Sequence, residues 1–180
     1  MGDLREDKKS TATGQETHQE NAPIAQSACI CIRHVFGRVF QFARRSGLDL
    51  LIDGAQGLEN WNVLSDENWR SQDGSLVADK GSSGFLVSKA AYKDFTIYAE
   101  FWAATDTNNG IFTRAADPTK IGADNSCEVM IWDIRPDPSY GTAAIVNFAK
   151  VTVPFAHKAG GQWNTMEVTA QGASITFKLL

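Results

Sequence analysis

Apolar and polar residues alternate strictly along residues 95–102, whose sequence is FTIYAEFW. A period of two places successive side chains on opposite faces and is typical of a half-buried strand. The polar turn 105–110 ends in a glycine that tolerates positive φ, and the short apolar stretch 111–114 follows it. We therefore expect 95–102 and 111–114 to pair as a hairpin.

A third alternating stretch, 127–133, places Glu128 on the same face as Met130 and Trp132, and Asp133 on the other face. A carboxylate beside an aromatic ring suits sugar recognition, because C–H groups stack on the ring while hydroxyls donate to the carboxylate. The ordinary alternative is a solvated Glu on the wet side of a sandwich.

Short apolar stretches separated by turn residues continue through the chain. They predict strands at 50–52, 68–78 (a hairpin turning at Asp73 and Gly74), 85–88, 143–153, 163–170 and 174–179. Antiparallel strands of this length, divided by Gly, Ser and Pro, predict an all-β sandwich of two sheets.

Residues 1–46 do not share this pattern and are predicted to be a separate N-terminal extension before a domain at 47–180. Residues 1–23 are polar and should be disordered. Residues 28–43 are more apolar, but charged residues interrupt them, so they fit neither a signal peptide nor a membrane span. They are expected to form either a weak amphipathic helix on the domain edge or a non-native extension.

The charge distribution argues against a nucleic-acid-binding surface. The net charge is −4, and residues 47–180 carry 10 basic against 16 acidic groups, so no basic stripe faces a phosphate backbone. Cys29 and Cys31 are too close in sequence to bridge comfortably, and Cys127 falls inside a predicted strand. All three cysteines are interpreted as small apolar residues, since no second pair of metal ligands accompanies them.

Seven motifs together resemble the 3-keto-disaccharide hydrolase domain family over residues 48–179. They lie, in family order, at 52–61, 69–76, 85–95, 100–101, 109–114, 127–133 and 161–165. The resemblance implies a concanavalin A-like jelly roll whose concave face holds a sugar, and hydrolysis of glycosides already oxidised to a ketone at C3. Some members of the family resemble lyases or hydratases. The family is typically exported in bacteria, which implies a periplasmic or secreted location although no signal peptide is recognisable here.

Two features depart from the family pattern. Many relatives have Tyr before the Glu and Gln or Asn two residues after it, where this chain has Cys127 and Met130. One polar sugar contact is therefore expected to be absent. Relatives also continue into further strands beyond Leu180, so the sandwich is expected to lack C-terminal strands and to leave an unpaired edge.

The spacing of acidic residues argues against ordinary glucanase chemistry. Sandwich glucanases place two carboxylates on either side of the glycosidic bond, commonly at alternate positions of one strand. Here the residues following Glu128 at those positions are Met130 and Trp132. Asp133 would lie on the opposite face, roughly 17 Å along a straight strand.

A 3-keto substrate requires only a base for the acidified C2 proton and a group that stabilises the enolate. Glu128 is the expected base, and Arg114 the expected stabiliser, because alternation would place Arg114 and Phe112 on one face of the preceding strand. A divalent cation held by Glu128 and Glu100 is a second possibility for the stabiliser. The alternative for Arg114 is a surface ion pair.

The remaining candidates are substrate-binding residues: Glu100, Trp102, Asn109, Trp132, Asp133, Arg135 and Tyr140. The structural alternatives are that Asp133 fixes the 135–140 loop through backbone hydrogen bonds and that Trp102 and Trp132 are buried. The lone loop residue His157 is expected to be solvated. Two other readings of the whole chain stay open, a noncatalytic sugar-binding module and an inactive fragment. The glycoside, the metal and the oligomeric state are not determined by the sequence.

Overall fold

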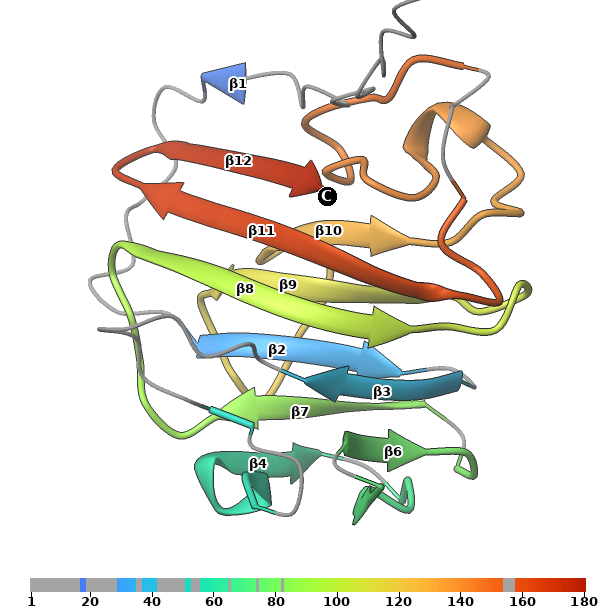
Figure 1. Ribbon diagram of the computed structural model, residues 1–180. Coiled ribbons are helices and arrows are strands. Elements are labelled where there is room, and N and C mark those ends of the chain that lie inside the picture. The colour runs from blue at the N-terminus through green and yellow to red at the C-terminus, as the bar shows by residue number, and fades with distance from the viewer. Residues whose placement is uncertain are drawn as a thin grey trace, which may run out of the picture.

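The computed structural model describes residues 17–18, 29–34, 37–41, 51–52, 56–64, 66–73, 75–81, 83–153 and 158–180, the first three ranges as backbone only. Within these ranges the chain forms two antiparallel sheets, which confirms the predicted all-β sandwich. A seven-stranded sheet has the order β1-β12-β11-β8-β3-β6-β5, and a five-stranded sheet has the order β10-β9-β2-β7-β4. Figure 1 shows β8 and β11 crossing in front of β9 and β10.

The strands are mostly short, as the spacing of turn residues predicts. They are β1 Thr17–His18, β2 Cys29–His34, β3 Gly37–Gln41, β4 Trp61–Leu64, β5 Arg70–Gln72, β6 Ser75–Ala78, β7 Gly84–Ser88, β8 Phe95–Trp102, β9 Asn109–Ala115, β10 Cys127–Ile131, β11 Trp163–Gln171 and β12 Ser174–Leu179. The described helices are two single 3₁₀ turns, η1 Leu58–Asn60 and η2 Pro138–Tyr140, and neither is long or apolar enough to cross a bilayer.

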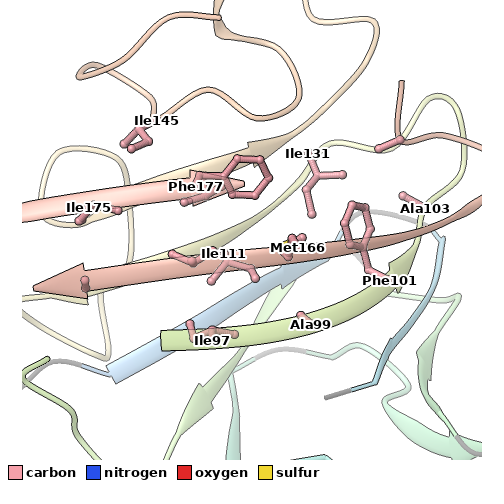
Figure 2. Packing of buried hydrophobic residues seen from close by; sticks show 14 of the residues in the cluster. Ile97, Ala99, Phe101, Ala103, Ile111, Ile131, Ile145, Met166, Ile175 and Phe177 are labelled. Carbon is pink, nitrogen blue, oxygen red and sulfur yellow. The ribbon is translucent and has the colours of Figure 1, made fainter. Parts of the chain in front are cut away.

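The inner faces of the two sheets form one apolar core. Ile97 and Phe101 of β8 and Met166 of β11 meet Ile111 of β9 and Ile131 of β10, all almost fully buried (Figure 2). Burying a side chain of this size contributes about 1.5–3 kcal/mol. The alternation predicted for 95–102 is thus confirmed, since every second residue of β8 enters this core. The expected hairpin of 95–102 with 111–114 is wrong, because β8 and β9 lie in different sheets.

Two predicted strands are wrong. Residues 51–52 are not in a strand, and the Leu51 carbonyl instead accepts a hydrogen bond from the Trp61 indole at 3.2 Å. Residues 143–153 form turns, with positive φ at Ala143 and Asn147. Left-handed residues bend the backbone and prevent an extended run. The segment is still apolar because it covers the edge of β10, where the Val146 N–H donates to the Glu128 carbonyl at 2.9 Å.

The helix considered for residues 28–43 is also wrong, because the described residues there form β2 and β3. β2 lies between β9 and β7, and β3 lies between β8 and β6, so both are interior strands (Figure 1). The expected unpaired edge at β12 is occupied in part by β1, whose two residues pair with Ser174 and Ile175. The disorder predicted for 1–23 concerns residues that, apart from β1, lie outside the described ones.

Candidate functional site

Glu128 lies on the outer face of the five-stranded sheet, turned away from the core. Its neighbours Val129 and Ile131 enter the core, whereas Glu128 stands opposite Phe112 of β9 and Met130 stands opposite Gly110. The side chain of Glu128 is only 4% exposed. It is therefore a buried carboxylate and not the solvated Glu that the ordinary alternative predicted.

Gly110 makes room for this carboxylate. A Cβ atom placed on Gly110 would lie 3.1 Å from both Cγ and Oε1 of Glu128 and 2.8 Å from the carbonyl oxygen of Val129. Atoms at 2.8 Å overlap, and the carbonyl belongs to a strand that cannot move freely. The Glu128 side chain thus leans across a position where only glycine leaves space.

We expect Gly110→Ala to displace Glu128 and to lower the free energy of unfolding by about 1–3 kcal/mol, the usual cost of overpacking. Urea unfolding measures the stability, and turnover under conditions where the variant stays folded measures the site. Gly122→Ala is a matched control, because a Cβ there meets no atom within 4 Å. Equal effects of the two substitutions would contradict the close contact between Gly110 and Glu128.

Arg114 does not share the face of Glu128, so the expected pairing of the two side chains is wrong. Arg114 has a φ of 57°, a left-handed conformation inside β9. This conformation shifts the alternation by one residue: Ala115, not Arg114, packs with Phe112 on the outer face. The guanidinium of Arg114 instead donates a hydrogen bond to the Gly172 carbonyl, in the turn between β11 and β12.

The charge of Arg114 acts on Cys127, which packs against the core. Burial raises the pKa of the Cys127 thiol, and the nearby Arg114 opposes this rise to a smaller extent. A thiol with a raised pKa stays protonated at neutral pH, which agrees with the interpretation of Cys127 as a small apolar residue.

Glu100 and Trp102 lie on the opposite side of the sandwich from Glu128. They alternate with the core residues of β8 and so occupy the outer face of the seven-stranded sheet, whereas Glu128 occupies the outer face of the other sheet. The core separates the two carboxylates, so Glu100 and Glu128 do not hold one cation together, contrary to the second possibility for the enolate stabiliser. Among the described residues, no group of three or more His, Cys, Asp or Glu side chains is arranged to hold a metal ion.

Asn109 is buried between the sheets, where a sugar does not reach it. It stands opposite Ile131 in the ladder of β9 and β10, and its side chain is 3% exposed. His157 lies outside the described residues.

Trp132, Arg135 and Tyr140 come together just beyond β10, as the sequence suggested for a ligand rim. The guanidinium carbon of Arg135 lies 5.7 Å from the ring centre of Trp132 and 5.8 Å from that of Tyr140. Lys150 joins them, with Nζ 5.1 Å from the Tyr140 ring centre. Cations at these distances are attracted to the ring faces. We call these four residues the cation–aromatic cluster.

Lys150 was missed by sequence reasoning because it is ten residues from Tyr140 and only the loop fold brings it there. The Val151 N–H donates to the Ser139 carbonyl at 2.9 Å, which closes the loop. Asp137 caps η2 by accepting from the Ser139 N–H and hydroxyl. These bonds, with a smaller contribution from Lys150 and Arg135, lower the pKa of Asp137.

Asp133 is a structural residue that joins two loops. Its carboxylate accepts hydrogen bonds from the Thr142 hydroxyl at 2.5 Å, from the Ala159 N–H at 3.1 Å and from the Gly160 N–H at 2.7 Å. The expectation that Asp133 fixes the 135–140 loop through backbone hydrogen bonds is wrong. The backbone groups it binds are in the loop before β11 and not in the 135–140 loop.

The family model of the 3-keto-alpha-glucoside-1,2-lyase-like domain matches residues 47–179. The chain belongs to this family. No curated protein and no solved structure gives a significant match.

The part of the chain matched to the 3-keto-alpha-glucoside-1,2-lyase-like domain contains Glu128, Gly110 and the cation–aromatic cluster. It begins after β2 and β3, although both of these strands lie inside the sheets. The sheet that carries Glu128 is therefore built from the family domain together with residues that precede it.

Proposed function

We propose that this protein cleaves 3-keto-glycosides and that Glu128 removes the C2 proton of the oxidised sugar. The family of the chain supports a glycoside-cleaving reaction of this kind. One observation carries the role of Glu128. Among the described side chains on this face of β4, β7, β9 and β10, Glu128 is the one carboxylate. One carboxylate suffices for proton abstraction but not for the two-carboxylate hydrolysis of ordinary glycosides.

The ketone at C3 makes this chemistry accessible to a single base. Glu128 takes the proton from C2, and the electron pair of that C–H bond is delocalised onto the C3 oxygen as an enolate. The pair then forms the C1–C2 double bond while the bond from C1 to the glycosidic oxygen breaks, and the leaving oxygen takes a proton from solvent. A lyase releases the resulting enone. A hydrolase adds water across it, with hydroxide at C1 and a proton at C2.

The surroundings of Glu128 favour this use of the carboxylate. Phe112 and Met130, both almost fully buried, stand beside it and reduce the access of competing water. Trp132 lies four residues further along, roughly 13 Å in an extended chain. We propose that a glycoside whose oxidised ring lies at Glu128 has its leaving group on the side of the cation–aromatic cluster.

A second candidate is a noncatalytic sugar-binding module. The 4% exposure of Glu128 favours it, because a carboxylate this deeply buried is reached by a sugar only if its cover moves. In such a module the ring-bearing residues, including Trp132 and Tyr140, would provide the affinity, and Glu128 would stay covered.

The fate of the C2 hydrogen tests the proposed reaction. We expect a 3-keto aryl glucoside deuterated at C2 to lose its label in the sugar product during the first turnovers, after subtraction of the exchange measured without protein. Mass spectrometry of the product measures the loss. Release of the aryl group with the label retained and with no primary deuterium isotope effect on the rate would contradict proton abstraction at C2, and the absence of release would favour the sugar-binding module.

A further inference from the structure

Two tryptophans stand side by side on the outer face of the seven-stranded sheet. Trp102 ends β8 and Trp163 begins β11, and the two residues are directly paired across the strands. Figure 1 shows these strand ends together, at the arrowhead of β8 and the tail of β11. Cross-strand partners have Cβ atoms about 5 Å apart, so the indoles are neighbours. Trp163 is 54% exposed and Trp102 is half-buried.

The backbone under these indoles is firmly held. The Gly161 N–H donates to the Ala103 carbonyl at 2.8 Å, and Ala103 also bridges Gly160. The buried amide of Asn164 donates to the carbonyls of Ala159 and Gln162 at 2.8 and 2.9 Å. A tryptophan on such a support loses little freedom when it binds, which lowers the entropic cost of association.

Polar groups border the two indoles on the same face. In the next row of the ladder, Glu100 pairs with Thr165, and both point away from the core. A carboxylate and a hydroxyl beside flat aromatic surface provide acceptors and a donor for the hydroxyl groups of a sugar whose C–H face lies on the rings.

We propose that Trp102, Trp163 and Glu100 form a carbohydrate-binding platform that is separate from the site at Glu128. Pyranose rings stack on the two indoles, and Glu100 accepts hydrogen bonds from sugar hydroxyls. The platform lies on the far side of the core from Glu128, so a glycan held here does not occupy the face where cleavage is proposed.

The size of the apolar surface favours a sugar over a protein partner. Half of a tryptophan side chain exposes roughly 100 Å², while a stable protein interface buries about 800 Å² on each partner. Leu180, whose N–H donates to the Thr165 carbonyl and which is 64% exposed, adds some apolar surface. Glu100 and Thr165 are polar, and charged residues are depleted from the centres of protein interfaces. One or two sugar rings, by contrast, match this area and polarity.

Titration of the full chain with unoxidised disaccharides tests the platform without any 3-keto chemistry. We expect maltose, cellobiose or trehalose to shift the indole N–H resonances of Trp102 and Trp163 in ¹⁵N spectra, at millimolar concentrations. Trp163→Ala should lower the affinity for the disaccharide that causes the shift by roughly tenfold, the contribution of one stacked ring. Trp163→Phe should retain most of this affinity. The two variants also assign the Trp163 resonance.

Two controls separate this platform from other causes. Phe148→Ala removes another exposed aromatic side chain and should leave the affinity unchanged. Glu128→Gln should also leave the Trp163 shift unchanged, so that failure of the proposed reaction and failure of the platform are observed separately. The proposal is overturned if none of the three disaccharides shifts the Trp163 indole, or if Phe148→Ala weakens binding as much as Trp163→Ala.

Discussion

Glu128→Gln will lower the turnover of 3-keto-trehalose by about 10²–10⁴-fold, the usual contribution of a positioned general base. Gln has nearly the same shape as Glu but does not accept a proton, so the substrate should still bind. We therefore expect the loss in kcat, with KM changed by only a few fold. Initial rates over a range of substrate concentrations measure both constants.

Glu167→Gln is the matched control for this prediction. Glu167 lies on β11, in the other sheet, and forms a surface ion pair with Lys178 at 3.1 Å. Loss of a surface pair costs at most about 1 kcal/mol and should leave turnover unchanged. An intact kcat in Glu128→Gln, with thermal melting showing a folded protein, would exclude Glu128 as the base.

Ile32→Pro will lower the free energy of unfolding by about 3 kcal/mol or more, because β2 is an interior strand. Ile32 pairs with Leu86 of β7 on one side and with Ile111 of β9 on the other. Proline has no N–H to donate to either neighbour, and its ring is not accommodated between two paired strands. Stabilities of small domains are about 5–15 kcal/mol, so the loss is large. Urea unfolding followed by tryptophan fluorescence measures it.

Val63→Pro provides the control in an edge strand. β4 borders the five-stranded sheet, and the bond from the Lys89 N–H to the Asn60 carbonyl sets its hydrogen-bonding pattern. In the antiparallel alternation that follows, the N–H of Val63 points away from β7 and makes no ladder bond. We expect a much smaller loss of stability there. Similar unfolding curves for the two proline variants would show that β2 is not held between β7 and β9.

The interior position of β2 affects the interpretation of Glu128. In the described five-stranded sheet, β9 and β10, which carry Gly110 and Glu128, have no ladder with β7 or β4, and β2 pairs with both β9 and β7. A protein reduced to the family domain at 47–179 would lack this connection. Activity assays on the full chain therefore test the proposed reaction more directly than assays on the domain alone.

Several elements were predictable because their pattern is local. Strand β8 was predicted with the bounds observed, and β11 and β12 to within one residue, since each alternates regularly and is bounded by turn residues. The segment 143–153 was wrongly predicted to be a strand. Its apolar residues cover the edge of β10, which produces an apolar run without a strand.

The candidate site was predictable only in part. Glu128 was singled out correctly as sharing a face with Met130, and Trp132, Arg135 and Tyr140 do gather. The face on which the Arg114 side chain lies was not predictable. One left-handed residue inside β9 reverses the alternation, and the pattern of apolar residues does not reveal it.

By itself, the sequence determined that this protein is an antiparallel β sandwich, which residues of β8 and β10 face the same way, and the family to which the domain belongs. Alternation and turn formation depend on residues that are close in sequence, so both can be recognised from the sequence. Only the tertiary structure decided that Glu100 and Glu128 lie on opposite sides of the core, that Lys150 meets Tyr140, and that β2 enters the sheet of Glu128. These facts depend on pairing between distant segments, for which a local period carries no information.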